Sequence, residues 1–226
     1  MAILSFQLNN HLFVRDPQHT QLGQKIISQS VEMIDRLGFE HFTFKKLAEE
    51  IESTEASIYR YFENKHRLLL YLVAWYWSWI EYRIDLASSL SQPAEERLKT
   101  ALRVIVEEKQ FDPSFAFVDE VALHRIVVSE LDKTYLTKSV DKDNQEGLFG
   151  GFKSLCKKIG TMVSEINKDF PYPNSLISTV LLAAKQQLFF SAHLPSLTNI
   201  RNGQSANEEI YLFIERLVFN TIQPNR

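Results

Sequence analysis

Two threonines in the first third of the chain constrain its fold more than any other feature. Thr43 and Thr54 are favourable N-cap residues, and each stands directly before a short run with helical spacing. Only Glu52 and Ser53 separate the two runs, so the two helices must cross at a steep angle, as in a helix-turn-helix. The apolar positions are Phe44, Leu47, Ala48 and Ile51 in the first run, and Ile58 and Phe62 in the second.

The second of these helices carries three bulky, polar-tipped residues in succession, Tyr59, Arg60 and Tyr61. Successive helical residues lie about 100° apart, so the three cannot all face one core, and some must point outward. In a helix-turn-helix the second helix lies in the DNA major groove, where hydroxyl groups donate to phosphates and arginine reaches guanine edges. The residues expected to contact DNA are Thr43, Lys46, Thr54, Glu55, Ala56, Ser57, Tyr59, Arg60, Tyr61 and Lys65.

A longer spaced pattern contains both helices. It reads Thr43-x₃-Leu47-Ala48-x₅-Thr54-x₃-Ile58-Tyr59-x-Tyr61-Phe62-x₂-Lys65-x₂-Leu68 and resembles the N-terminal signature of TetR/AcrR-type transcriptional regulators. The resemblance covers about residues 21–70 and implies a DNA-binding domain followed by an all-helical domain that dimerises and binds an effector. It also implies phosphate contacts by Thr43, Ser57, Tyr59, Tyr61 and Lys65, and base-facing positions for Glu55, Ala56 and Arg60.

Two features depart from the family pattern. The usual small, glycine-containing turn is replaced by Ile51-Glu52-Ser53, and a residue other than glycine is strained in a left-handed turn. Either Glu52 sits differently or the turn is remodelled. Residues 21–67 also carry seven basic and eight acidic side chains, a sum of −1. Because non-specific DNA affinity depends on neutralising phosphates, we expect it to be weak here.

The rest of the chain predicts more helices. It is 226 residues long with only 7 Gly and 7 Pro, and no stretch alternates convincingly enough to demand a sheet. We therefore expect an all-α fold, in which a three-helix helix-turn-helix domain precedes a larger helical effector-binding and dimerisation domain. The expected ranges are 1–20 for an N-terminal arm, 21–66 for the DNA-binding domain and 67–226 for the effector domain.

Aromatic residues mark the beginning of that larger domain. Tyr71, Trp75 and Trp79 lie at i, i+4 and i+8, so they share one helix face. Such a stripe can line a pocket for an apolar or aromatic effector, and it is equally typical of ordinary core packing. The further residues expected to contact an effector are Arg83, His124 and Phe152, with Lys153 as another polar anchor.

Other motifs predict little chemistry. Gly147-Leu148-Phe149-Gly150-Gly151 lacks a preceding strand and a Gly-Lys-Ser/Thr ending, so a close helix crossing is favoured over a phosphate cradle. The 6 histidines show no zinc spacing, and the single cysteine, Cys156, is expected to be an inert helical thiol. We expect no enzyme activity, no cofactor and no bound metal.

Both ends of the chain allow more than one interpretation. Two apolar helices, over residues 175–193 and 208–222, form either a buried pair or half of an intermolecular four-helix bundle, and the family resemblance favours a homodimer. The first 20 residues contain one basic residue, Arg15, so a minor-groove arm is disfavoured. We expect either disorder or an apolar arm, with Ile3, Leu4, Phe6, Leu8, Leu12 and Phe13, docked on the body.

These features favour a cytoplasmic, homodimeric transcriptional regulator, more often a repressor than an activator, that binds a pseudo-palindromic double-stranded operator. The longest apolar run, Leu68 to Ile80, is too short to span a membrane as a helix, and no signal peptide or membrane partner is expected. One alternative is a helical small-molecule-binding protein with weak or lost DNA binding. An all-α enzyme would need an acid–base cluster that the sequence does not contain.

Overall fold

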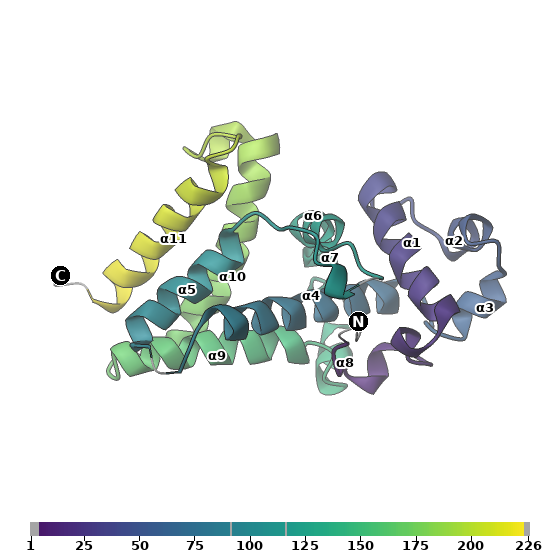
Figure 1. Ribbon diagram of the computed structural model, residues 1–226, viewed down its shortest axis with the longest axis horizontal. Coiled ribbons are helices and arrows are strands. Elements are labelled where there is room, and N and C mark those ends of the chain that lie inside the picture. The colour runs from purple at the N-terminus through teal and green to yellow at the C-terminus, as the bar shows by residue number, and fades with distance from the viewer. Residues whose placement is uncertain (1–4, 91, 116, 224–226) are drawn as a thin grey trace. The chain divides into compact units, whose positions relative to one another are not determined.

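The computed structural model describes residues 5–90, 92–115 and 117–223, and all regular secondary structure in these ranges is helical. The prediction of an all-α fold is therefore confirmed (Figure 1). The chain forms two compact units. Unit 1 comprises Met1–Ser78 and Lys109–Gly151, and unit 2 comprises Trp79–Glu108 and Phe152–Arg226. Two long helices, α4 (Lys65–Ala87) and α9 (Gly150–Ile166), contribute residues to both units.

The first three α-helices of unit 1 form the group predicted from the capping residues: α1 (Gln21–Leu37), α2 (Phe44–Glu50) and α3 (Glu55–Tyr59) (Figure 1). The N-terminus of α2 is capped by Thr43, whose hydroxyl accepts a hydrogen bond from the Lys46 amide at 3.3 Å. In α3, Thr54 accepts from the Ser57 amide at 3.2 Å. The apolar positions of both helices, from Phe44 to Phe62, are all buried, so these two helices form where local spacing predicts them.

The N-terminal segment of unit 1 is docked, as one of the two interpretations of the sequence proposed. It contains two short 3₁₀ helices, η1 (Asn10–Leu12) and η2 (Pro17–His19), and Leu12 is almost fully buried. The backbone of η2 passes so close to α1 that a Cβ on Gly23 would lie 2.3 Å from the Pro17 carbonyl oxygen. A side chain at position 23 is therefore incompatible with this packing. Ile3 and Leu4 lie outside the described residues.

The rest of unit 1 includes η3 (Pro113–Phe115), α6 (Glu120–Glu130), α7 (Asp132–Tyr135) and α8 (Val140–Gln145). Helix α6 packs on α1, and the Arg125 guanidinium donates two hydrogen bonds to the Asp35 carboxylate at 2.9 and 2.7 Å. At the start of α9, a Cβ on Gly151 would lie 3.1 Å from the Ala74 carbonyl oxygen of α4. The glycine-rich stretch thus serves a close helix crossing, as predicted.

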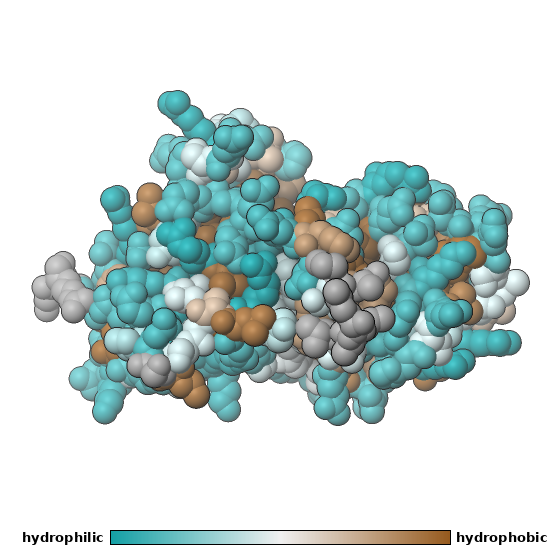
Figure 2. Space-filling view, viewed as in Figure 1, coloured by the Kyte–Doolittle hydropathy of each residue, from teal (hydrophilic) through white to brown (hydrophobic). Residues whose placement is uncertain are grey.

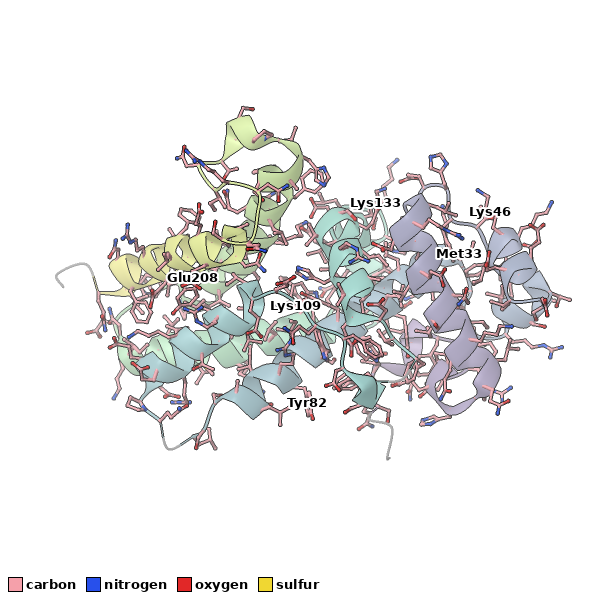
Figure 3. All side chains as sticks on the ribbon, turned by 45° about the horizontal axis from the view of Figure 1, so that its top comes forward. Met33, Lys46, Tyr82, Lys109, Lys133 and Glu208 are labelled. Carbon is pink, nitrogen blue, oxygen red and sulfur yellow. The ribbon has the colours of Figure 1, made fainter. Side chains whose placement is uncertain are left out.

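Unit 2 contains α5 (Ala94–Val106), α10 (Pro173–His193), η4 (Pro195–Leu197) and α11 (Ala206–Ile222), with the adjoining parts of α4 and α9. Helices α10 and α11 lie side by side, and α5 packs on both (Figure 1). Salt bridges join neighbouring helices of this unit. Arg103 of α5 pairs with Glu208 of α11 at 2.7 Å, and Lys158 of α9 pairs with Glu81 of α4 at 2.9 Å (Glu208 is labelled in Figure 3).

Asp143 and Ser205 lie in or next to the first turn of a helix, and the side chain of neither caps a helix N-terminus. Asp143 does not begin a helix, because it lies inside α8, where its buried carboxylate accepts from the Ser139 hydroxyl at 2.8 Å. Ser205 does precede α11, but its hydroxyl donates to Glu209 at 2.8 Å and caps no backbone amide. In both places a serine hydroxyl donates to a carboxylate, and no side chain caps a backbone amide. No helix in the described part of the chain is long and apolar enough to cross a bilayer.

Candidate DNA-binding surface and effector residues

The corner between α2 and α3 is tight, and one residue has an unusual backbone conformation there. Helix α2 ends at Glu50 and is followed by its C-cap residue Ile51, whose side chain is buried. The Ser53 amide donates back to the Ala48 carbonyl at 2.9 Å. Between them Glu52 takes a φ of 54°, the only positive φ of any described residue other than glycine. The left-handed turn is therefore kept even though glycine is absent, and Glu52 accepts the strain of that conformation.

No described part of the chain covers the outward flank of α3. Glu55, Ala56 and Arg60 are exposed, and Tyr59 retains 49% of its accessible surface. The Tyr59 ring leans edge-on against Phe44 with 5.2 Å between the ring centroids, which holds the hydroxyl away from the core. Arg60 makes no hydrogen bond or ion pair with a described residue. Side chains that can donate to phosphates or base edges thus line one face of α3.

Tyr61 departs from the expectation of a phosphate contact. Only 3% of it is exposed, and its hydroxyl shares a hydrogen bond of 2.8 Å with the Thr20 hydroxyl at the start of α1. The Arg15 guanidinium covers the ring at 5.5 Å from the centroid. Because both its face and its hydroxyl are engaged, Tyr61 positions the end of α3 and does not extend into solvent.

Lys65 is engaged in the same way. Its ammonium group donates to three backbone carbonyls, those of Phe39 at 3.1 Å, Glu40 at 3.3 Å and Phe42 at 3.2 Å. An ammonium has three donors, so these bonds use its full hydrogen-bonding capacity. The motif identifies the position of this lysine. In the structure its hydrogen bonds tie α4 to the loop after α1, and a phosphate contact would require these bonds to open.

Few positive charges are left for DNA. Among the basic residues of 21–67, Arg36 pairs with Glu50 at 3.8 Å and Arg67 with Glu146 at 2.5 Å. Lys45 and Lys46 are exposed on α2 and form no ion pair with a described residue; Lys46 donates only to the His41 carbonyl at 2.9 Å (labelled in Figure 3). Together with Arg60, these lysines supply the positive charge of this surface, whose visible face is mainly hydrophilic (Figure 2).

The aromatic stripe of α4 is buried where it belongs to unit 1. Tyr71 and Trp75 are both 0% exposed. The Trp75 ring lies edge-on to Phe6 and Phe115, with centroid distances of 5.2 and 5.4 Å, and Tyr71 lies 6.2 Å from Phe13. In this part of the stripe the core alternative describes the packing, with the N-terminal segment as its cover. The sequence gives apolar residues in that segment but no sign of their register on α4.

The remaining expected effector residues of α4 and α9 lie in unit 2. Trp79 is 1% exposed, and the Arg83 guanidinium stacks on its ring at 5.2 Å from the centroid. Arg83 also pairs with Glu107 at 2.8 Å. Phe152 is half-buried near the start of α9. Arg83 thus has an internal counter-ion, which reduces its availability to an anionic ligand.

A buried polar cluster surrounds His124 in unit 1. The Tyr76 hydroxyl lies 2.7 Å from His124 Nδ1, and the two rings are stacked. Burial, with smaller contributions from Lys109 and Arg125, lowers the pKa of His124 to about 3, so the imidazole is neutral at pH 7. Lys109, labelled in Figure 3, is itself 4% exposed. The neutral imidazole of His124 and the Tyr76 hydroxyl are groups that can fix the orientation of a bound molecule.

Glu120 is a member of this polar region that sequence reasoning missed. It lies one turn before His124 on α6, is 0% exposed, and its Oε2 accepts from the Asp112 amide at 3.3 Å. Its other oxygen, Oε1, has no hydrogen-bond partner among the described residues. Burial raises the pKa of Glu120 to about 7. The i, i+4 spacing of Glu120 and His124 is visible in the sequence, but burial of the glutamate is not.

Other chemistry finds little support among the described residues. No group of three or more His, Cys, Asp and Glu side chains there could hold a metal ion. Burial raises the pKa of the Cys156 thiol to about 11, so the reactive thiolate is scarce at pH 7, as expected for an inert cysteine.

The capped corner, the exposed flank of α3 and the packing of α1 against α2 define a helix-turn-helix domain. Residues 26–72 match the family described as bacterial regulatory proteins, tetR family. This match to an N-terminal domain of the tetR family confirms the resemblance based on the spacing from Thr43 to Leu68. A search of curated proteins found no match to the sequence.

Solved structures show the same fold over nearly the whole chain. A structure of AibR in complex with isovaleryl coenzyme A and operator DNA has a TM-score of 0.53 at 14% identity, covering 87% of this chain and 98% of that one. The fatty acid degradation regulator FadR from Bacillus halodurans has a TM-score of 0.56 at 14% identity, with coverages of 89% and 95%. A TetR-family transcriptional regulator from Bordetella parapertussis 12822 has a TM-score of 0.54 at 14% identity, covering 91% of this chain and 96% of that one. At these identities the likeness establishes the fold.

Proposed function

We propose that this protein is a transcriptional regulator that binds operator DNA through α3 and releases it on binding a small-molecule effector. The observation that carries the proposal is the free flank of α3 within a domain of the tetR family. Arg60 reads a base edge, Tyr59 donates to a phosphate, and Ala56 allows a close approach to the bases. Thr54 and Ser57 bond to each other at 3.0 Å and present their hydroxyls beside the same groove.

The three-dimensional arrangement refines the proposed contact set. Thr43, Lys46, Glu55 and Arg60 are exposed, whereas Tyr61 and Lys65 act by holding α3 and α4 in place. Lys45 joins the set because it is exposed on α2 beside Lys46 and has no ion-pair partner among the described residues. Since Arg36 and Arg67 are ion-paired and Lys65 is fully hydrogen-bonded, few described basic residues are left for phosphates, and specificity rests on base contacts more than on charge.

The effector site belongs to the helices that follow the DNA-binding domain, and the range 67–226 remains our proposed effector and dimerisation domain. In unit 1 the polar cluster of Tyr76, Glu120 and His124 supplies the polar contacts of the proposed site. The unsatisfied Glu120 Oε1 and the neutral His124 favour an uncharged or weakly polar ligand. One structural neighbour is a complex with isovaleryl coenzyme A and another is a fatty acid degradation regulator, and an effector with an apolar hydrocarbon part is compatible with both.

We further propose that the active form is a homodimer formed through α10 and α11. On α11, Leu212 and Phe213 each keep 44% of their surface exposed, an arrangement that a partner helix would cover. A two-fold dimer would present two α3 helices roughly 34–36 Å apart, or a multiple of it, to a pseudo-palindromic operator. Repression in the cytoplasm is the form of regulation that we expect.

The DNA proposal is tested by three single variants on operator and random duplexes. Arg60→Ala should weaken operator binding by about tenfold and relax one operator position, with little effect on random DNA. Tyr59→Phe should weaken both duplexes to a similar and smaller extent. Lys46→Ala should lower the salt slope of binding by about 1. Equal losses on both duplexes for Arg60→Ala would show that Arg60 does not read a base.

A second candidate function is a helical small-molecule-binding protein that has lost DNA binding, which the acidic balance of residues 21–67 favours. A gel-shift assay against the promoter region upstream of the coding gene distinguishes the two. Specific retardation that disappears with Arg60→Ala supports the regulator. A complete absence of binding at low salt, with the protein dimeric, would favour the second function.

A further inference from the structure

The N-terminal segment Phe6–Thr20 contacts both regions to which a binding role has been assigned. At one end Phe6 covers Trp75, and its ring is stacked on Phe115 with 5.3 Å between centroids. At the other end the Val14 amide donates to the Tyr61 carbonyl at 2.8 Å. Tyr61 stands just after α3. One short segment therefore connects the aromatic face of α4 with the end of α3, the proposed recognition helix.

The segment is closed on itself, so a displacement at one end is carried to the other. The Gln18 side-chain amide clasps the backbone of Phe6, accepting from its N–H at 3.2 Å and donating to its carbonyl at 2.9 Å. Gln18 is 5% exposed, and its backbone carbonyl accepts a hydrogen bond from the Gln24 side-chain amide at 2.7 Å. The loop from residue 6 to residue 18 is thus held as one body on α1.

A third set of contacts fixes the middle of the segment. The Asn9 side chain donates to the Glu146 carbonyl at 2.9 Å, just before the turn into α9. A Cβ on Gly147 would approach that same Asn9 amide to 2.8 Å, so the turn accommodates the segment closely. Phe13 packs on Tyr71, which in turn contacts Phe62, directly after Tyr61.

We propose that residues 6–20 form a strap that couples the aromatic face of α4 to the recognition helix. Packing of the Phe6 ring against Trp75 and Phe115 keeps the Gln18 clasp closed, and the clasp keeps Val14 and Thr20 on Tyr61. When Phe6 leaves, these contacts loosen and α3 loses the support at its C-terminal end. The inference deepens the proposed function, on which its regulatory meaning rests.

Hydrogen exchange of the full-length protein tests the coupling without any ligand or DNA. Phe6→Ala should raise exchange of amides in 55–63 by about tenfold relative to the unmodified protein, while amides of α6 in 120–130 change little. Phe6→Leu, which keeps most of the apolar contact with Trp75 and Phe115, should restore most of the protection. The matched control is Phe149→Ala, another half-buried phenylalanine of unit 1 that makes no ring contact with a described residue.

Several outcomes would overturn the strap. They are unchanged exchange at 55–63 in Phe6→Ala, an equal rise in Phe149→Ala, or a uniform rise that includes 120–130. A second variant, Gly23→Ala, loosens the same segment from the opposite side because its Cβ would meet the Pro17 backbone. It should accelerate exchange at 55–63 as Phe6→Ala does, and protection there equal to the unmodified protein would also contradict the proposal.

DNA binding separates the failure of the strap from the failure of the regulator. If the unmodified protein binds operator DNA, Phe6→Ala should weaken it by at least about fivefold although residue 6 is remote from α3. Unchanged affinity would overturn the coupling. If the unmodified protein binds no DNA while the exchange difference stands, the regulator proposal fails and the physical coupling is still supported.

Discussion

The flank of α3 and the aromatic face of α4 were assigned binding roles by the same kind of argument, yet the structure treats them oppositely. On α3, Tyr59 keeps about half of its surface and Arg60 is exposed. On α4, Tyr71 and Trp75 are completely buried. The difference shows that helical spacing determines which residues share a face, while the segment that covers the face decides whether it can bind anything.

That covering segment lies far from both helices in sequence. Phe6 precedes Trp75 by nearly seventy positions, and no local property of α4 identifies it as the partner. The flank of α3 stays free because its neighbours, α2 and the following turn, are only a few residues away and use the opposite face for packing. Short-range contacts are therefore the better guide to function in this chain.

The largest expected effect tests this contrast by comparing the free energy of unfolding of two variants. Trp75→Ala should lower the free energy of unfolding by about 3 to 5 kcal/mol, because it empties a site closed by Phe6 and Phe115. Tyr59→Ala, half-exposed on α3, should cost less than about 1 kcal/mol. Urea denaturation of both variants measures the difference. A mild loss for Trp75→Ala would mean that the aromatic face is loosely packed and open to ligands.

The next effect concerns the polar part of the expected effector region. Because the folded-state pKa of Glu120 is about 7, above its unfolded value, the native state binds more protons between about pH 4.5 and 7, and stability falls as pH rises through that range. Glutamine does not titrate, so Glu120→Gln removes this pH dependence. The stability of the variant relative to the unmodified protein should rise by roughly 3 kcal/mol from pH 4 to pH 8. Denaturation at several pH values measures it.

The comparison with Glu120→Gln must be made as a difference between proteins at each pH. His124 has a folded-state pKa of about 3, so it removes stability as pH falls below about 6.5, the opposite direction. This contribution is common to both proteins and cancels. A stability difference that does not vary with pH would show that Glu120 is ionised normally and that the site is open to water.

How much the sequence could predict follows the same division between near and distant contacts. Thr43, Thr54 and the buried pair of Ile58 and Phe62 were found because caps and helical spacing act within a few residues. The burial of Tyr61 and the hydrogen bonds of the half-buried Lys65 were missed because their partners belong to distant segments, Thr20 and the loop after α1. The motif identifies both positions, but it does not show which groups satisfy their polar atoms.

Lys65 is the subject of the third test. Like Tyr71 and Trp75 of α4, it was expected to bind a ligand but contacts other parts of its own chain. Lys65→Met keeps the apolar stem but removes three charged hydrogen bonds to the 39–42 loop, so stability should fall by about 2 kcal/mol. The control Lys46→Met, exposed on α2, should change stability by less than about 0.5 kcal/mol. Thermal or urea denaturation measures both.

DNA binding gives the complementary half of the Lys65 test. The salt slope of operator binding should fall by about 1 for Lys46→Met and stay unchanged for Lys65→Met. A reduced slope for Lys65→Met would place its ammonium on a phosphate and return it to the set of DNA contacts.

The smallest effect concerns the turn on which the exposure of α3 depends. Glu52 holds a φ of 54°, a conformation that costs an L-residue roughly 1 kcal/mol or more and that glycine adopts freely. Glu52→Gly should therefore raise the free energy of unfolding by about 0.5 to 1 kcal/mol, once the greater flexibility of glycine in the unfolded chain is subtracted. Glu49→Gly, within α2, should instead cost about 1 kcal/mol. A loss of stability for Glu52→Gly would show that the glutamate side chain supports the turn, and the corner would then owe its shape to this residue and not to the caps on either side.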